Sequence, residues 1–345
     1  MKTSTRLQSV GLLALVLPAL MLSACTGTDR EPSSNQTDTA SISGYVPPAA
    51  TEIAPLTGLS VEAGSLARPS LAAKIDNHVA ARPQVSIDST DLVFEELVEG
   101  GITRYVAVWQ SDIPDQVGPV RSIRPMDPDI IAPFGGLVSY SGGQQRFVDA
   151  MNDTGQISAV FDYDTTGLFS RSAATASPHN VILAASEFLN RNVSVAPPAQ
   201  QYAYAATLSG ASAATDGTPI SVINTRFSNS SARSWTWNAE AAAYLRAQDG
   251  VPDLTAGGVQ LMATNVVVLR VDVTVDQSIP ETELIASGEA SISTGGRTLA
   301  ATWSKASQTA PIRLIDANGV TIRLAPGNTW FQLVPNGTGG ADLVP

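Results

Sequence analysis

The stretch Asp91–Gln110, DLVFEELVEGGITRYVAVWQ, contains two apolar runs separated by a polar segment with two glycines. Residues 92–97 and 105–109 are rich in Val, Leu, Phe, Tyr and Trp, which predicts a strand in each run. Glu95 and Glu96 are neighbours in the first run, and neighbouring residues of a strand point to opposite faces. We therefore expect one of them to be buried with an arginine and the other to be exposed.

Similar runs at 71–75, 137–140 and 181–183 predict further strands on either side of this stretch. Between them, Asp127-Pro128-Asp129 supplies an N-cap Asp, a proline at the first helical position and an acid in the first turn, which predicts a helix start. Phe147, Ala150 and Met151 have helical spacing. This alternation predicts an α/β or α+β fold, with a mixed α/β layered domain over residues 56–198.

The second half of the chain has a different pattern. Residues 199–218 are rich in Ala, Ser, Thr and Gly and predict a linker. Beyond it, short strand-like runs with Gly295-Gly296 and Asn318-Gly319 as hairpin turns predict a mostly antiparallel β domain over 219–336 and a tail over 337–345. The runs that suit strands are 219–227, 233–237, 242–248, 262–275, 283–293, 297–303, 312–315, 320–324 and 330–334.

The N-terminus predicts export and lipid anchoring. Residues 1–24 combine two positive charges, an apolar run and small residues, as a secretory signal peptide does. They end in Leu-Ser-Ala before Cys25, and Leu-Ser-Ala-Cys resembles a bacterial lipobox. On that resemblance, Cys25 is lipidated and attaches the chain to the extracytoplasmic face of the cell membrane. Residues 25–55 are rich in Thr, Ser, Asp and Pro and predict a disordered tether.

Charge narrows the range of partners. The formal net charge is −11, from 20 Lys and Arg against 31 Asp and Glu. Because binding to nucleic acid depends on clustered cations, the composition argues against a nucleic-acid partner. An anionic membrane surface would also repel the body of the protein, so attachment through lipid on Cys25 is the expected membrane contact. Nothing in the sequence requires a cofactor.

Candidate ligand-binding residues gather in the first half, several of them at the ends of predicted strands, where layered α/β proteins form ligand crevices. The loop GPVRSIRP (118–125) places Arg121 and Arg124 between two prolines that restrict it. We expect these arginines to bind an acidic group of an envelope ligand or cell-wall protein. The full candidate set is Asp76, Asn77, His78, Glu95, Glu96, Arg104, Arg121, Arg124, Ser141, Gly142, Gly143, Arg171, His179 and Asn180.

Other interpretations of the same residues stay open. The arginines could pair internally with Asp76, Glu95, Glu96 and Asp127. The two histidines, His78 and His179, lack the local spacing of a metal motif, so no metal is predicted; either could act as a general base in an enzyme that acts on a phosphate or carboxylate. Ser141 precedes Asp162, Asp164 and His179 in a hydrolase-like order, and a purely structural scaffold is a third class.

Ten segments between residues 56 and 335 carry a family resemblance. They are LTGL (56–59), KIDNHVAARPQ (74–84), DLVFEELVEGGITRYVAVWQ (91–110), VGPVRSIRPMD (117–127), YSGG (140–143), SPHNVIL (177–183), WTWNAEAAAYLR (235–246), ATNVVVL (263–269), GRTLAATWSK (296–305) and LAPGNTWFQLVP (324–335). In this order they resemble the YerB-like bacterial lipoproteins. That family is a domain of unknown function with N- and C-terminal parts. The resemblance therefore implies an envelope lipoprotein of two parts and assigns no reaction.

Overall fold

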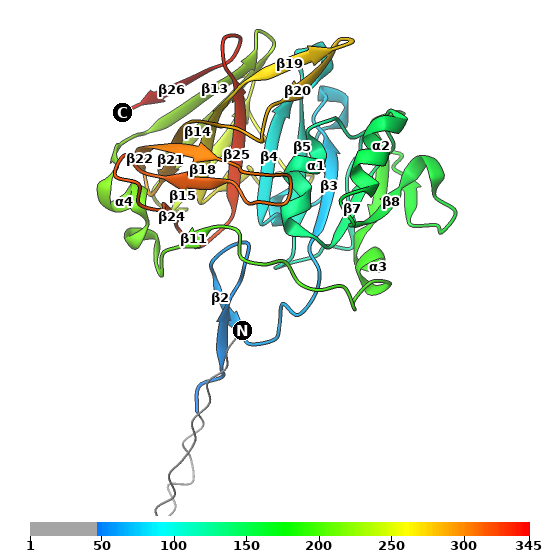
Figure 1. The fold of residues 1–345 in the computed structure, drawn as a ribbon, viewed down its shortest axis with the longest axis horizontal. Coiled ribbons are helices and arrows are strands. Elements are labelled where there is room, and N and C mark those ends of the chain that lie inside the picture. Colours follow the sequence, from blue (N-terminus) through cyan, green and yellow to red (C-terminus); the bar gives the residue numbers. More distant parts are fainter. Residues whose placement is uncertain (1–46) are drawn as a thin grey trace, which may run out of the picture. The chain divides into compact units, whose positions relative to one another are not determined.

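One sheet of eleven strands contains residues from both halves of the sequence (Figure 1). The structure is a computed structural model in which residues 47–345 are described. The predicted signal peptide, Cys25 and most of the predicted tether lie outside these residues. In order across the sheet, the strands are β12 (Thr218–Pro219), β22 (Arg297–Ser304), β21 (Ser287–Thr294), β18 (Asn265–Val271), β25 (Thr329–Pro335), β4 (Leu92–Leu97), β5 (Thr103–Trp109), β3 (Leu71–Asp76), β7 (Leu137–Tyr140) and β8 (Ile157–Val160), with β23 (Arg313–Ile315) beside β22.

The central strands are buried on both faces. Every residue of β3, β5 and β25 is buried. Strands covered on both sides are expected to be almost continuously apolar, which is why the sequence shows runs here and not strict alternation. The strands predicted at 71–75, 92–97, 105–109, 137–140 and 181–183 are all present.

Strand pairing joins the two halves. β4 pairs in parallel with β25, from Leu92 opposite Thr329 to Glu95 opposite Gln332. β25 also pairs in parallel with β18, so the second half is not antiparallel throughout. The segment predicted as a linker, 199–218, contains β11 (Ala203–Tyr204), which pairs with β24 (Arg323–Leu324), and the short helix α4 (Ser212–Asp216). Residues 49–345 form one compact unit.

A second, antiparallel sheet covers one face of the large sheet. Its strands are β16 (Val251–Pro252), β15 (Ala243–Gln248), β14 (Ser231–Asn238), β13 (Val222–Ser228) and β26 (Gly340–Val344), with β17 (Met262–Ala263) beside β15. Trp235 of β14 packs against Trp330 of β25, with ring centroids 5.1 Å apart, so aromatic packing fills the space between the sheets. The predicted tail, 337–345, thus contains an edge strand, β26, paired with β13.

The opposite face is covered in part by short helices. α1 (Asp127–Ile131) and α2 (Gln145–Asn152) contribute Ile130, Phe147 and Met151 to this side of the core. α3 (Ala185–Asn190) instead lies on the side of the second sheet, at the small sheet formed by β6 (Gln116–Val117), β10 (Val181–Ala184) and β9 (Phe169–Arg171), and its Phe188 belongs to the same part of the core as Trp235. Both helices predicted near 127 and 147 exist, although the first has only five residues and Met126 occupies its N-cap.

The fold is therefore mostly β with several sheets, and the α/β layering predicted for the first half is not confirmed. The physical reason is that the second face of the large sheet is covered by the strands of residues 222–252 and by β6 and β10, with the short helix α3 beside them. The remaining elements are β1 (Thr51–Ile53), β2 (Ser60–Glu62), β19 (Val273–Asp276), β20 (Ile279–Thr282) and the 3₁₀ turns η1 (Val79–Ala81), η2 (Ile87–Ser89), η3 (Glu99–Gly101), η4 (Ala132–Phe134), η5 (Phe161–Tyr163) and η6 (Leu208–Gly210). Because β1 pairs with β2, strand structure begins at Thr51. The segment 25–55, which was predicted to be a disordered tether, therefore contains a strand at its C-terminal end.

Candidate functional site

Asp76, at the end of β3, is the centre of the candidate site. Its side chain is 1% exposed. Oδ1 accepts a hydrogen bond from the backbone N–H of His78 at 2.9 Å. Oδ2 lies 2.7 Å from Nδ1 of His179 and 3.1 Å from Nε of Arg121. Because an ionised carboxylate can only accept, His179 donates through Nδ1, and in its neutral form Nε2 is then the acceptor nitrogen.

The two histidines lie together. The rings of His78 and His179 are stacked, with centroids 4.4 Å apart and planes 14° from parallel. His78 Nδ1 accepts from the N–H of Ala80 at 3.1 Å and caps η1, so the proton of a neutral His78 lies on Nε2. Residues about a hundred positions apart in the sequence therefore form one pair next to Asp76.

The loop 118–125 is held by the strands on either side of it. The N–H of Arg121 donates to the carbonyl of Lys74 on β3 at 2.8 Å, and the N–H of Ser141, after β7, donates to the carbonyl of Arg121 at 3.0 Å. The N–H of Val120 donates to the carbonyl of Val181 at 2.8 Å. These bonds fix the backbone of Arg121 between the ends of β3 and β7.

Arg104 and Arg124 lie close to Arg121. Arg104, the partner of Asp76 in the β3–β5 ladder, donates through Nη1 to the carbonyl of Ser122 at 2.8 Å. Burial lowers the pKa of Arg104 to about 10, with further contributions from the charges of Arg124 and Arg121. The three guanidinium groups are thus close enough to repel one another, and a bound anion would relieve that repulsion.

Internal pairing satisfies these arginines only in part. Arg121 Nε lies 3.1 Å from Asp76 Oδ2 as an ion pair, yet this buried Nε makes no hydrogen bond, and neither Nη atom donates one to the residues that the structure describes. Arg104 Nε is buried without a partner in the same part of the chain. Arg124 is more fully occupied, because Nε donates to Glu99 Oε2 at 2.7 Å and Nη1 donates to the carbonyl of Ile123 at 2.8 Å. The expected pairing therefore holds for Arg121 with Asp76 and is replaced by Glu99 for Arg124.

A buried ion cluster holds the end of the loop 118–125 in place. Lys74, fully buried on β3, contacts Glu96 and lies 2.7 Å from Oδ1 of Asp127. Asp127 Oδ2 accepts from the backbone N–H of Arg124 at 2.6 Å. The cluster fixes the start of α1 relative to β3, and Glu96 belongs to it. The expectation that one of the two neighbouring glutamates would be exposed is wrong, because Glu96 is completely buried.

Glu95 lies on the other face of β4, away from Arg121. It accepts from Arg233 Nε and Arg246 Nη2, each at 2.7 Å. Burial alone would raise the pKa of Glu95, but the charges of Arg246 and Arg233 outweigh burial and lower it to about 2. The predicted burial of a glutamate with an arginine is confirmed here, while alternation along the strand removes Glu95 from the arginine site.

Ser141 and the glycines that follow it position the loop. Ser141 Oγ lies 3.3 Å from Oγ of Ser122, and the carbonyl of Gly142 accepts from the N–H of Ile123 at 3.0 Å. A Cβ at Gly143 would lie 3.0 Å from a side-chain carbon of Ile123. Since the hydroxyl of Ser141 contacts Ser122 and not His179, the hydrolase-like order of the sequence does not form a catalytic triad.

The remaining candidates make structural contacts. Asn77 Nδ2 donates to Thr103 at 2.7 Å and to Gln248 at 2.9 Å, which ties β3 to the second sheet. Asn180 Oδ1 accepts from Arg171 at 2.7 Å. The Arg171 guanidinium lies 4.8 Å from the ring centroid of Phe161. These contacts shape the loop that carries His179, and they place Arg171 against its own loop.

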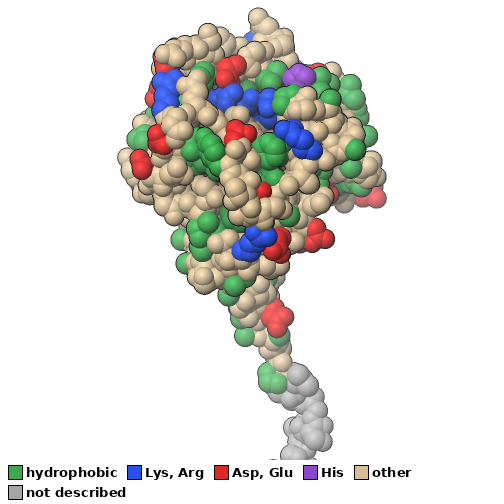
Figure 2. Space-filling view, turned by 90° about the vertical axis from the view of Figure 1, so that its right-hand side faces the viewer, with side chains coloured by type: hydrophobic (Ala, Val, Ile, Leu, Met, Phe, Trp, Pro, Cys, Tyr) green, Lys and Arg blue, Asp and Glu red, His purple; other side chains and the backbone are tan. Residues whose placement is uncertain are grey.

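The candidate set predicted from the sequence leaves out two charged residues of the site, Lys74 and Glu99. Lys74 is two residues before Asp76 on the same strand and therefore on the same face, a spacing that could have found it. Glu99, the partner of Arg124, gave no such signal. Figure 2 shows Lys and Arg side chains gathered beside a histidine on one face of the molecule. Among residues 47–345, no helix combines the length and apolarity needed to cross a membrane.

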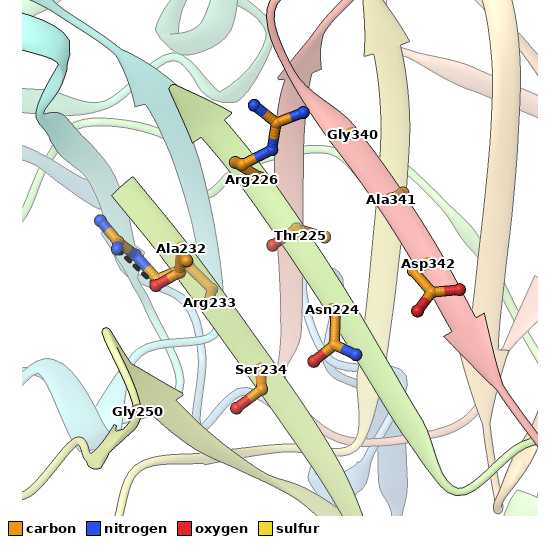
Figure 3. Close-up of a pocket in the computed structure, with 10 residues that line it drawn as sticks. All are labelled: Asn224, Thr225, Arg226, Ala232, Arg233, Ser234, Gly250, Gly340, Ala341 and Asp342. Carbon is orange, nitrogen blue, oxygen red and sulfur yellow. Dashed lines mark hydrogen bonds between the residues drawn. The ribbon is translucent and has the colours of Figure 1, made fainter. Parts of the chain in front are cut away.

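A separate depression of about 540 Å³ lies on the outer face of the second sheet (Figure 3). Small side chains such as Ala232 and Ser234 form its floor, with Arg226 and Asp342 on neighbouring strands. Arg233 turns away from it to Glu95. Because Arg226 and Asp342 have opposite charges, this face does not concentrate charge of one sign as the loop 118–125 does.

Comparison with known proteins gives a family without an assigned activity. Residues 56–196 match the model described as Protein of unknown function (DUF3048) N-terminal domain, and residues 223–331 match the DUF3048 C-terminal domain. A curated relative, "Putative lipoprotein YerB" of Bacillus subtilis (strain 168), is 49% identical over 71 residues, which span 21% of this chain and 22% of the relative. The crystal structure of YerB protein from Bacillus subtilis superposes with a TM-score of 0.73 at 23% identity, covering 84% of this chain and 99% of that chain. This structural likeness shows a shared fold.

Proposed function

Because the chain belongs to the DUF3048 family, whose members have no assigned function, we propose a function from the site itself: a lipid-anchored binding protein of the bacterial envelope that holds an anionic group at Arg104, Arg121 and Arg124. The observation that carries this proposal is the free hydrogen-bonding capacity of Arg121 next to two other guanidinium groups. The net charge of the chain is −11, so three neighbouring arginines are a local exception to its acidic composition.

Two observations support the proposed lipid anchor at Cys25. Leu-Ser-Ala-Cys at 22–25 has the form of a lipobox, and the curated relative carries the word lipoprotein in its name. Lipidation of Cys25 would place residues 47–345 on the extracytoplasmic face of the membrane. The ligand would then be a component of the envelope, present on the same side as the folded part.

The ligand group is a phosphate or a carboxylate. Arginine presents a planar set of N–H donors that matches either group in a bidentate arrangement. The N–H groups of Arg121 are held by a backbone bonded to β3 and β7, so little loop entropy is lost when an anion binds. The alternative to a small anionic ligand is a cell-wall protein that presents an acidic side chain to the same arginines.

Calorimetric titration with inorganic phosphate and with acetate tests the proposal. The chain from Thr26 onward contains the whole compact unit 49–345 and lacks the anchor. We expect measurable binding of at least one anion, weakened about tenfold or more by Arg121→Ala, because a hydrogen bond to a charged group contributes about 1.5–3 kcal/mol. Arg313→Ala, at an exposed arginine on β23, is the matched control and should leave binding unchanged. Equal binding by both variants would exclude Arg121 from the site.

A second candidate function is hydrolysis of a phosphomonoester, favoured by the Asp76–His179 hydrogen bond. With Nδ1 donating to Asp76, His179 Nε2 can take a proton from water. The resulting hydroxide forms a new bond to phosphorus, the bond from phosphorus to the alcohol oxygen breaks, and the alcohol leaves with the proton from His179. Release of 4-nitrophenol from 4-nitrophenyl phosphate should then occur with the unsubstituted chain and be lost in His179→Ala. Absence of release with the unsubstituted chain would leave only the binding role.

A further inference from the structure

A groove of about 710 Å³ lies beside β26, the strand at the C-terminal end of the chain (Figure 1). Ala341 and Leu343 of β26 line it, together with residues of β18, β21 and β22 in the large sheet. Glu289, Ala300 and Thr302 on these strands line the groove and are exposed, so the second sheet leaves this part of the large sheet uncovered. The groove thus combines the edge of one sheet with an uncovered face of the other.

β26 has a neighbouring strand on one side only. Its neighbour is β13, and within residues 47–345 it is the last strand of the second sheet. The N–H of Trp237 on β14 donates to the carbonyl of Ser221, just before β13, so odd-numbered residues here bond to β14 and even-numbered ones to β26. Even-numbered residues of β13 lie opposite even-numbered residues of β26. The N–H and C=O groups of Ala341 and Leu343 therefore point away from β13.

Arg270 of β18 lines the same groove and has an unpaired donor. Its Nη1 is buried and donates no hydrogen bond to the residues that the structure describes. Burial lowers the pKa of Arg270, and the charge of Glu289 opposes this effect without cancelling it. A buried donor without a partner costs free energy, and a carboxylate is the group that a guanidinium pairs with best. The groove therefore favours a partner with an acidic side chain.

Small side chains leave room for a polypeptide backbone in this groove. Ser291 of β21 and Ala300 of β22 lie opposite each other in the ladder, and both line the groove. A free strand edge offers a row of backbone donors and acceptors, which an extended peptide matches and a helix does not. Alternate side chains of such a peptide would point toward the large sheet, where Arg270 lies.

We propose that β26 binds an extended peptide segment of another protein, which adds to the second sheet as a strand and presents an Asp or Glu side chain to Arg270. This surface shares no residue with the anion site at Arg121 and goes beyond the proposed function. A second copy of this chain fits less well. Its own β26 would place Ala341 and Leu343 toward the large sheet and so present no acid to Arg270, and two chains of net charge −11 repel each other.

Selection from a phage-displayed library of random octapeptides on the chain from Thr26 onward tests this surface. We expect the enriched peptides to be rich in β-branched residues and to share one Asp or Glu. A synthetic copy of an enriched peptide should bind Arg270→Gln about tenfold more weakly, because a hydrogen bond between charged groups is lost. Replacing the peptide's acid by its amide should weaken binding to the unsubstituted chain equally and have little further effect on Arg270→Gln. Arg313→Gln, at an exposed arginine on β23, is the matched control.

Ala341→Pro tests strand addition separately. Proline removes an N–H that points away from β13, so the β13–β26 ladder is kept while an added strand loses a hydrogen bond. We expect peptide binding about tenfold weaker or more, with an unchanged melting temperature. If this variant is unstable, the comparison of the acidic and amide peptides on Arg270→Gln still decides the proposal.

The outcomes are distinct. A library that yields no enriched peptide would overturn the proposal, and so would peptides that bind Arg270→Gln as tightly as the unsubstituted chain. Sedimentation equilibrium provides the last measurement: a dimer that Ala341→Pro abolishes would identify a second copy as the occupant and overturn the separate partner. Phosphate affinity should be the same in Arg270→Gln and the unsubstituted chain, so failure here leaves the anion site untouched.

Discussion

Arg246 on β15 donates through Nη2 to Oε2 of Glu95 on β4 at 2.7 Å, and neither side chain is exposed to solvent. This ion pair joins the region matched by the N-terminal family model to the region matched by the C-terminal one. The Arg246 guanidinium also lies over the Trp330 ring, 4.9 Å from its centroid. A charged group placed in an aromatic core stabilises the fold only while its carboxylate partner is present.

Glu95→Gln should therefore lower the free energy of unfolding by about 3 kcal/mol, because two buried guanidinium groups lose a charged partner. The folded pKa of Glu95 is about 2, below its ordinary value. Its stabilising contribution is thus complete above about pH 4.5 and is lost as pH falls toward 2. Urea unfolding at pH 7 and pH 3 measures both effects. Glu240→Gln, at an exposed turn, is the control, and an equal loss at Glu95 and Glu240 would contradict the prediction.

Sequence patterns were sufficient for the strands and insufficient for their assembly. Buried runs such as 92–97 carry a local signal, whereas the pairing of β4 with β25 joins residues more than two hundred positions apart and leaves none. The segment 199–218 has a linker-like composition, yet the Tyr204 hydroxyl within it donates to the carbonyl of Leu56 at 2.6 Å. The composition of a segment indicates its average preference for solvent. A few aromatic residues in the segment can still hold it against the core by packing.

Asp91→Asn should flatten the pH dependence of stability between pH 4 and 6. Burial raises the pKa of Asp91 to about 6, although Oδ2 accepts from the N–H groups of Gln110 and Ser111. A carboxyl whose folded pKa is raised stabilises the protein below its unfolded pKa, and the contribution, about 3 kcal/mol at most, is lost as pH rises through 6. Melting temperatures across this range measure it. Parallel curves for Asp91→Asn and the unsubstituted chain would refute it, and Asp88→Asn, at an exposed neighbour, is the control.

Glu99→Gln should increase the affinity for inorganic phosphate about threefold. Glu99 competes with any ligand for Nε of Arg124, and a partly exposed ion pair of this kind contributes up to about 1 kcal/mol. Removing the charge frees Arg124 for the anion without touching Arg121. Calorimetry measures the change, with Glu62→Gln on β2 as the control. Unchanged affinity would show that Arg124 has only a structural role.

Part of the candidate site could be found from the sequence. Asp76 and Arg121 carried signals, as polar residues at a strand end and in a proline-flanked loop. The stacking of His78 on His179 left no signal in the sequence, because only the loop that follows β9 brings the two residues together. Glu95 was included because spacing along a chain does not tell which face of the sheet forms the site. Tertiary structure alone separates Glu95 from Arg121.

Gly142→Ala should weaken both stability and phosphate binding. Gly142 has φ +150°, and a Cβ there would clash with the carboxylate of Asp162. The carbonyl of Gly142 accepts from the N–H of Ile123, so displacement would move the loop that carries Arg121. We expect a loss of about 2 kcal/mol in unfolding free energy together with weaker binding. Gly155→Ala, with φ +80° and open space around it, controls for backbone strain, and intact binding in Gly142→Ala would contradict the coupling.

Residues 49–198, expressed alone, should fail to unfold cooperatively. Without the second half, β4 loses its parallel partner β25, and Glu95 loses Arg233 and Arg246, leaving a buried carboxylate unpaired in an open sheet edge. Mixing this fragment with residues 199–345 should restore a single cooperative transition, because the contacts between the halves are those of one core. Calorimetry of each fragment and of the mixture measures this. An independent transition for 49–198 would mean that the ion pairs and the β4–β25 ladder are dispensable for folding of the first half.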